Sequence, residues 1–262
     1  MALQLNKDTK KTPDSPAQRK ALDEAVQRLE KVRNSSKIDQ IKRWSSTHNV
    51  NINIGLRRYQ LEVADETVVD AFRQAASAGS LHWAARQDPG NSNEHQTLMS
   101  WSWVIAFGSV EERKKLSQVE QKLFATDEDK DYTETRSLLC VLQGYLSSGQ
   151  LDVKAADAIV AAASHKKASR AASITAKPYA EGLIALSQGN AEAWNVAMAA
   201  LLSEHERHAF RGELVDLCDG YMAPFPLSLL RLGIERGLVC SIKSLHLPVR
   251  LVEQAWKLSV SG

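Results

Sequence analysis

Positions 205–208 hold two histidines and a glutamate, which are residue types that bind zinc or transfer protons. The order is His205-Glu206-Arg207-His208. A zinc-binding helix of the zincin type needs two residues between the glutamate and the second histidine, so that both imidazoles lie one turn apart. Here the histidines are three positions apart, and the sequence indicates no third ligand. The segment therefore predicts a solvated helix surface or loop, and we expect no metal and no cofactor.

A second group of polar residues that could carry catalysis surrounds one predicted turn: His82, Asp88, Glu94 and His95. Such a site would require these scattered side chains to converge in a pocket with shifted pKa values. The sequence contains none of the compact motifs of a nucleophile elbow, a phosphate-binding loop or a dinucleotide site. We therefore expect that the protein is not an enzyme, and a site of scattered residues stays the alternative.

The three cysteines, Cys140, Cys218 and Cys240, each stand alone in an apolar stretch. No two of them have the spacing of a metal-binding or redox motif. An odd, unclustered set is typical of free thiols in a reducing compartment. We expect all three to be buried in the core.

Composition and charge limit the classes of partner. Lys and Arg number 33 and Asp and Glu number 31, a formal charge of +2, which favours neither nucleic acid nor a membrane surface. The first residues lack the apolar region of a secretory signal, and no stretch reaches the roughly 18 apolar residues of a membrane span. We expect a soluble, cytoplasmic protein.

The strongest local charge lies between residues 126 and 134, where five acids and one base give −4. By contrast, residues 1–50 carry eleven bases and six acids, a local charge of +5. The acidic segment could bind a basic partner, or it could be a solvated loop whose acids stabilise the start of the next helix. Glu213, Asp216 and Asp219 form a weaker acidic stripe at helical spacing. The first segment supplies the predicted partner-binding residues Asp127, Glu128, Asp129, Asp131 and Glu134.

Trp101 and Trp103 are two positions apart, so on a helix their side chains point to different faces. One of them could pack inside while the other lies in a groove or on a partner surface, because tryptophan is a favoured interface anchor. The alternative is that both pack in a large helical core. We include both among the predicted partner-binding residues.

Apolar residues recur at helical spacing along most of the chain. Residues 1–17 are polar and contain two prolines, which predicts a flexible tail. Residues 18–262 predict a single all-α domain, a multi-helix bundle of about ten helices packed as antiparallel hairpins. The bundle is helical-repeat-like but lacks a fixed period of about 34 residues, and a sub-division near 126–134 is possible. Residues 50–56 alternate apolar with other residues, so we expect an extended connection there, with a lone strand as the alternative.

Four features follow one another in the C-terminal half of the sequence. They are the run Pro178-Tyr-Ala-Glu-Gly-Leu-Ile-Ala-Leu-Ser-Gln-Gly-Asn, the segment from Trp194 to Leu202, the segment from Phe225 to Ile234 followed by Gly237, and the pair Leu247-Pro248. This order resembles the immunity protein 49 family of bacterial polymorphic-toxin systems. The resemblance covers roughly residues 135–256 and consists of helix-packing positions.

The resemblance implies a cytoplasmic protein, encoded beside a toxin, that neutralises the toxin by direct binding and occlusion of its active site. The implied partner is a toxin effector, a nuclease or another toxin that acts in the cytosol. The resemblance implies no functional residues, because the matched positions pack helices. The alternative is a helical-repeat-like scaffold or adaptor that binds a protein segment in a concave groove.

Overall fold

The computed structural model describes residues 16–87, 93–124, 133–214 and 217–260. These residues form eleven α-helices and no strand, which confirms the all-α prediction. The helices are α1 (Pro16–Asn34), α2 (Gln40–Gln60), α3 (Asp65–Ala85), α4 (Glu94–Phe107), α5 (Val110–Leu116), α6 (Thr133–Ser148), α7 (Val153–Ala163), α8 (Lys177–Ser187), α9 (Ala191–Arg211), α10 (Pro224–Glu235) and α11 (Val249–Val260). Three short helical turns join them: η1 (Gln121–Phe124), η3 (Ala172–Ala176) and η4 (Cys218–Tyr221).

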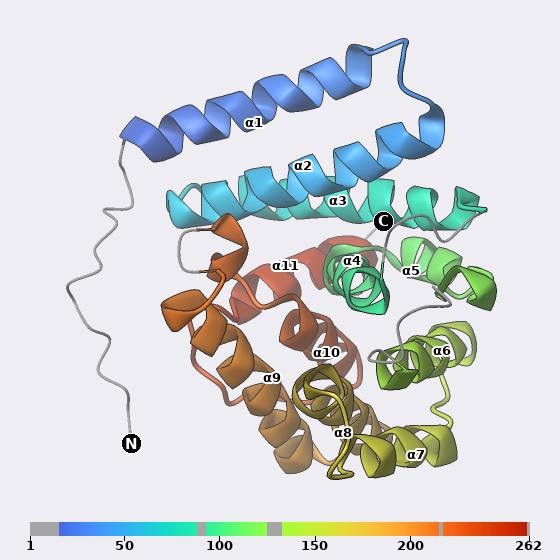
Figure 1. Cartoon of the computed structure of the whole chain (residues 1–262). Helices are drawn as coiled ribbons and strands as arrows, with labels where there is room; N and C mark the ends of the chain where they lie inside the picture. The colour runs from blue at the N-terminus through green and yellow to red at the C-terminus, as the bar shows by residue number, and fades with distance from the viewer. Residues whose placement is uncertain (1–15, 88–92, 125–132, 215–216, 261–262) are drawn as a thin grey trace.

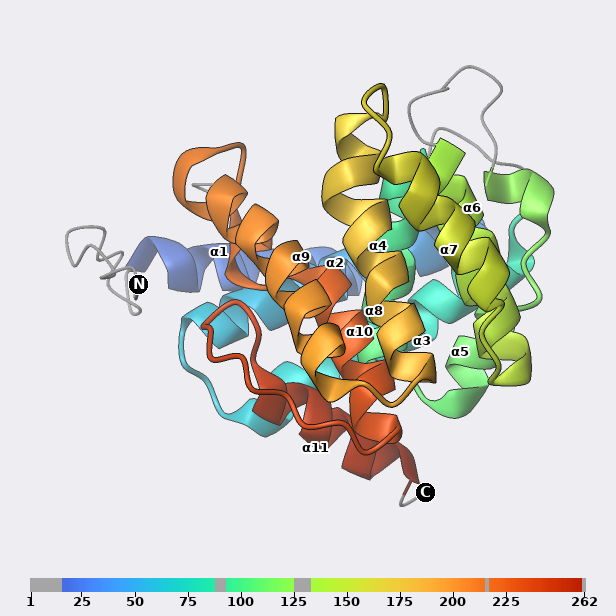
Figure 2. The ribbon, with the colours of Figure 1, turned by 90° about the horizontal axis from the view of Figure 1, so that it is seen from below.

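The helices form a multi-layered bundle. α1, α2 and α3 lie side by side at one end, and α7, α8 and α9 lie at the opposite end (Figure 1). Between them, α4 packs against α3 and α10, and α11 packs against α3, α4 and α10. Viewed from below, α8 lies between α7 and α9 (Figure 2). Helices adjacent in sequence therefore pack as neighbours, as the short connections predict.

The predicted tail and sub-division fall largely outside the described residues. Pro16 and Ala17, which were assigned to the tail, instead begin α1. Proline is accepted in a first helical turn because its missing N–H has no partner there in any helix. Of the possible boundary at 126–134, the structure describes only the start of α6.

The prediction for residues 50–56 is wrong, because they belong to α2. Val50 and Ile54 pack in a small cluster with α1, whereas Ile52 and Leu56 belong to the main core. Residues four apart share one face of a helix, while residues two apart lie on nearly opposite faces. Because α2 lies between α1 and α3, both faces are buried, and the apolar pattern imitates the alternation of a strand (Figure 1).

One close helix contact in the core depends on Gly233 of α10. A Cβ at this position would lie 2.0 Å from Cζ2 of Trp194 in α9. The indole is fully buried, and its Nε1 donates a hydrogen bond to the carbonyl of Leu229 at 3.3 Å. The ring is therefore anchored, and a larger residue at position 233 would have to displace it.

We expect Gly233→Ala to lower the free energy of unfolding by about 1–3 kcal/mol, because overpacking a filled core forces backbone or side-chain shifts. This cost opposes the better helix propensity of alanine. Gly144→Ala in α6 is the matched control, since nothing lies within 4 Å of the added Cβ. It should raise stability by up to about 1 kcal/mol. Urea denaturation measures both variants, and equal effects would contradict the role given to the Trp194 contact.

Candidate functional site

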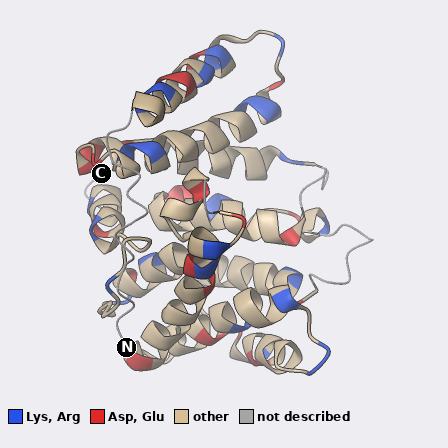
Figure 3. Cartoon of the chain, turned by 60° about the vertical axis from the view of Figure 1, so that its left-hand side comes forward, with Lys and Arg blue, Asp and Glu red and all other residues tan. Residues whose placement is uncertain are grey.

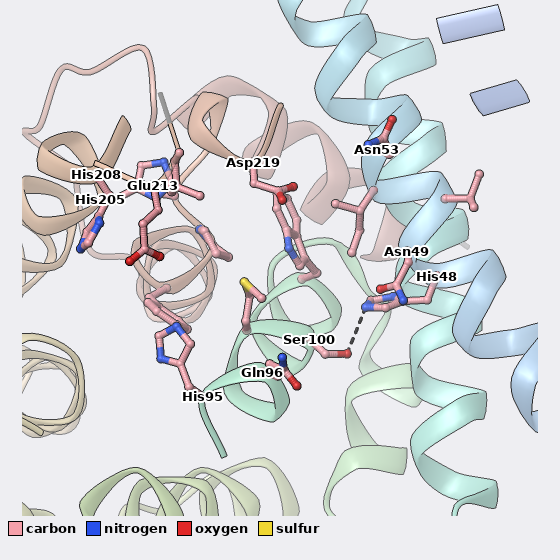
Figure 4. Close-up of a pocket in the computed structure, with 18 of the residues that line it drawn as sticks. His48, Asn49, Asn53, His95, Gln96, Ser100, His205, His208, Glu213 and Asp219 are labelled. Atoms are coloured by element: carbon pink, nitrogen blue, oxygen red, sulfur yellow. Dashed lines mark hydrogen bonds between the residues drawn. The ribbon is translucent and has the colours of Figure 1, made fainter. Parts of the chain in front are cut away.

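A groove of about 1070 Å³ lies between α2 and α4 on one side and α9 and the start of α10 on the other, with residues of α1 also lining it. In Figure 4, side chains of α2 face side chains of α9 across the groove, and those of α4 lie between them. Small-molecule pockets span about 300–1,000 Å³. This groove therefore has room for a ligand larger than most cofactors, including a short stretch of polypeptide.

Five of the seven histidines in the chain line this groove: His48, His82, His95, His205 and His208. Burial lowers the pKa of His48 and that of His205 to about 4 each. Burial also lowers the pKa of His82 and that of His95. These four imidazoles are therefore uncharged at neutral pH, and each offers one donor and one acceptor nitrogen.

His48 is the centre of a hydrogen-bond chain that links three helices. Its Nδ1 lies 2.7 Å from the carbonyl oxygen of Ala75 in α3, and its Nε2 lies 3.0 Å from Oγ of Ser100 in α4. Because a carbonyl only accepts, Nδ1 carries the hydrogen, and Nε2 accepts from the Ser100 hydroxyl. Trp83 in turn donates from Nε1 to Ser100 Oγ at 2.9 Å. The chain fixes the floor of the groove.

The Ser100–His48 pair has the spacing of a nucleophile and its general base. Two features oppose that function. A base with a pKa near 4 holds a transferred proton poorly at neutral pH. Ser100 also lies in the middle of α4, where backbone N–H groups are engaged within the helix and are not directed at a developing oxyanion. The geometry favours a structural role for this pair.

One polar row runs along α2 at intervals of four residues: Ser45, Asn49, Asn53 and Arg57, called the α2 row below. Asn53 donates from Nδ2 to Sγ of Cys218 at 3.0 Å and accepts at Oδ1 from Nε of Arg57 at 2.7 Å. Asn49 is exposed and points into the groove (Figure 4). Three side chains with both donors and acceptors, and then the donor Arg57, therefore line the groove at a regular spacing.

Sequence reasoning missed the α2 row, and it also missed Gln96, an exposed groove residue of α4. The available signal was the four-residue spacing of the polar positions. That signal depends on a continuous helix through residues 50–56, which the apolar alternation concealed.

The histidine run at 205–208 lies in α9 and is not a freely solvated surface, because both histidines are half-buried and face the groove. His205 donates from Nε2 to the carbonyl of Gly220 at 3.2 Å. Glu206 instead accepts a hydrogen bond from the Ser244 hydroxyl at 2.7 Å. The described residues contain no group of three or more His, Cys, Asp or Glu side chains that could hold a metal ion.

Glu204 of α9 also lines the groove, and it forms ion pairs with Arg207 of α9 and with Arg170, which precedes η3. It accepts from Arg207 and from Arg170, and His208 Nε2 lies 3.1 Å from its Oε1. The hydrogen bond from Arg207 lowers the pKa of Glu204 to about 2. Glu204 therefore stays ionised, and its charge is largely balanced within the protein.

The predicted surface role of Trp101 and Trp103 needs correction. Trp101 is completely buried, with its ring edge-on to Phe124, and therefore has no surface for a partner. Trp103 is 5% exposed, stacks on Phe72 and is one of the residues that line the groove. Both side chains pack inside because α4 lies among α3, α5, α6, α10 and α11 and is buried around most of its circumference.

The predicted acidic partner site cannot be placed as a whole. Asp127, Glu128, Asp129 and Asp131 lie outside the described residues. Glu134 lies in the first turn of α6 and is half-buried. The role of this segment stays a prediction.

The residues of the alternative catalytic site only partly converge. His82 and His95 line the groove. Glu94 is fully buried and pairs with Arg136 at 2.9 Å. Asp88 lies outside the described residues. Within the described residues, the two histidines therefore share the groove without Glu94.

The cysteines differ from their predicted burial. All three are free thiols, but each is half-buried at the edge of the core. Burial raises the pKa of each thiol. Cys218 contacts the groove indirectly, as the acceptor for Asn53.

Comparison with models of known families, with curated proteins and with solved structures gives no match. Among the described helices, none combines the length and the apolar character that crossing a bilayer requires. Function therefore has to be argued from the groove.

Proposed function

We propose that this chain is an immunity protein that binds a toxin in the cytoplasm and neutralises it by receiving a segment of the toxin in the groove. The observation that carries the proposal is the groove itself, with a volume of about 1070 Å³ and a lining that combines apolar, uncharged polar and charged side chains. If the segment in the groove is a loop of the toxin's active site, this chain would block that active site sterically. The identity of the partner rests on the resemblance of roughly residues 135–256 to the immunity protein 49 family.

The charges on the described helices outside the groove are mixed in sign. Basic and acidic residues are interspersed along the helices, as Figure 3 shows. Interspersed charges give little electrostatic steering towards one face. A concave site with convergent polar groups is the usual place for recognition in a helical protein.

A scaffold or adaptor that binds a protein segment is the second candidate. The observation that favours it is the lining of the groove, which combines polar side chains with the aromatic rings of Trp103 and Phe225. This candidate and the immunity function share the binding mode and differ in the partner. A partner that is lethal to its host when expressed alone separates them.

The proposal is tested by co-expression with the product of the adjacent gene, scored by host survival and co-purification. We expect the wild-type chain to rescue the host and to co-purify with the toxin. Asn49→Trp and Gln96→Trp fill the groove from exposed positions and should abolish both effects, while circular dichroism shows an unchanged helical fold. Ala158→Trp, at an exposed position of α7 away from the groove, is the matched control and should rescue fully.

Two results would contradict the proposal. If the product of the adjacent gene is harmless and does not associate with this chain, the immunity function is wrong and the adaptor function remains. Full rescue by both groove-filling variants shows that the toxin binds another face. Charge reversal at Asp127, Glu128, Asp129 and Asp131 would then test the acidic segment.

A further inference from the structure

We infer that the groove binds an extended, basic segment of the partner, with the main chain of that segment paired along the α2 row. This inference rests on the proposed function, because it names the part of the partner that enters the groove. It is carried by the spacing of the α2 row, the free donors and acceptors along it, and the charge of the groove walls.

The spacing of the α2 row matches an extended chain. Four helical residues rise about 6 Å, at 1.5 Å per residue. Two residues of an extended chain rise about 6.6 Å. Side chains at successive positions of the row therefore lie beside every second residue of an extended segment. From Ser45 to Arg57 the row spans about 18 Å, which is the length of about five extended residues.

The chemistry of the row also suits a main chain. A carboxamide has an acceptor oxygen and two N–H donors, so it can pair with a peptide C=O and a peptide N–H. Asn49 is exposed, and Asn53 keeps one N–H group beyond its bond to Cys218. The bonds from Asn53 to Cys218 and from Arg57 to Asn53 hold the row in place before binding, which lowers the entropy cost of association.

The wall formed by α4 and the start of α10 offers contacts for side chains. Gln96 is exposed, and Met99 is 36% exposed beside it. His95 packs edge-on to Phe225, with ring centroids 5.2 Å apart. In an extended chain, successive side chains point to opposite sides. Every second side chain of the segment therefore faces this mixed apolar and polar wall.

The charge of the lining favours a basic segment. Four carboxylates and two guanidinium groups line the groove, and Arg170 and Arg207 balance one of the carboxylates, Glu204. Three carboxylates against two guanidinium groups leave a formal balance of −1, and four of the groove's histidines are uncharged at neutral pH. Complementary charge mainly sets specificity and the association rate. The acids are Glu24, Glu204, Glu213 and Asp219, and the bases are Arg28 and Arg57.

Two of these acids are placed to select a lysine or arginine side chain. Glu204 is already balanced by Arg170 and Arg207. Glu213 and Asp219 are exposed and belong to the lining of the groove (Figure 4). They belong to the acidic stripe found in the sequence, and in the structure they line the groove.

The test is a display library of linear random peptides selected on the intact protein. We expect enriched peptides to contain an excess of Lys and Arg. A synthetic peptide from the selection should bind at least about tenfold more weakly to Asn49→Trp and to the double variant Glu213→Gln with Asp219→Asn. The matched control is Asp157→Asn with Glu192→Gln, which removes the same charge from exposed positions outside the groove and should bind as the wild type does.

Main-chain recognition has its own readout. Methylation of single peptide nitrogens along the selected sequence should weaken binding at every second position, because alternate N–H groups face the α2 row. Uniform tolerance of methylation would overturn the inference, as would peptides without a basic excess. Enrichment of no peptide, or binding to oligosaccharides on a glycan array instead, would overturn it too. Host rescue would still decide the immunity function, so the two failures are distinguishable.

Discussion

Replacing Glu235 with alanine is expected to lower the free energy of unfolding by about 3–5 kcal/mol, because it leaves two buried guanidinium groups without their counter-charge. The side chain of Arg231 is completely buried and that of Arg113 is 8% exposed. An isolated charge in such surroundings loses its hydration without compensation. The variant therefore tests how far the core depends on one carboxylate.

The geometry of this ion-pair network explains the expected size of the effect. Both terminal nitrogens of Arg113 donate to the Glu235 carboxylate at 2.7 Å each, and Nε of Arg231 donates to it at 2.8 Å. Although burial opposes ionisation, the two guanidinium groups lower the pKa of Glu235. Arg231 also donates to the hydroxyl of Ser259 at 2.7 Å, so the network connects α5, α10 and α11.

Glu204→Ala is the matched control for Glu235→Ala. Its side chain is 20% exposed, close to the 24% of Glu235, and it also pairs with two arginines. Those arginine side chains are 63% and 45% exposed, so water screens the interaction. We expect a cost below about 1 kcal/mol. Urea denaturation at neutral pH measures both, and equal losses would show that the buried arginines recover their hydration when Glu235 is absent.

Sequence patterns predicted the fold class, because the apolar periodicity of a helix such as α9 reflects burial on one side. They failed at α2, which is buried on two sides. There Val50 and Ile54 face α1 while Ile52 and Leu56 face the core, and the two stripes together read as alternation. A single sequence does not separate these cases, since the pattern depends on which neighbours the helix acquires.

The groove was harder to predict than the fold. Its histidines come from α2, α3, α4 and α9. They are far apart in the sequence, so no single motif contains all five. His48 lies in the polar run Ser45-Ser46-Thr47-His48-Asn49, and nothing in that run indicates that its ring contacts Ala75 and Ser100. The acidic stripe near Glu213 was visible in the sequence, but its position beside the α2 row depends on tertiary packing.

Acidification from pH 6.5 to about 4 is expected to cost the folded state about 3 kcal/mol through His48 alone. Burial lowers the pKa of this imidazole to about 4, against 6.5 in its ordinary state. Between these values the unfolded chain binds a proton that the folded chain does not. The contribution of His48 is therefore complete above pH 6.5 and is lost as the pH falls towards 4, and His205 acts in the same direction.

His48→Asn isolates this effect, because the amide can still donate to the carbonyl of Ala75 but does not titrate. The variant should be less stable than the wild type at pH 7, since it leaves unfilled space, and the difference should shrink by about 3 kcal/mol at pH 4. His165→Asn, which replaces an exposed imidazole, is the control and should keep the wild-type pH dependence. Urea denaturation at several pH values measures all three proteins. The difference in the free energy of unfolding between wild type and His48→Asn could instead stay constant from pH 7 to pH 4. That result would show that His48 binds a proton as readily in the folded chain as in the unfolded chain.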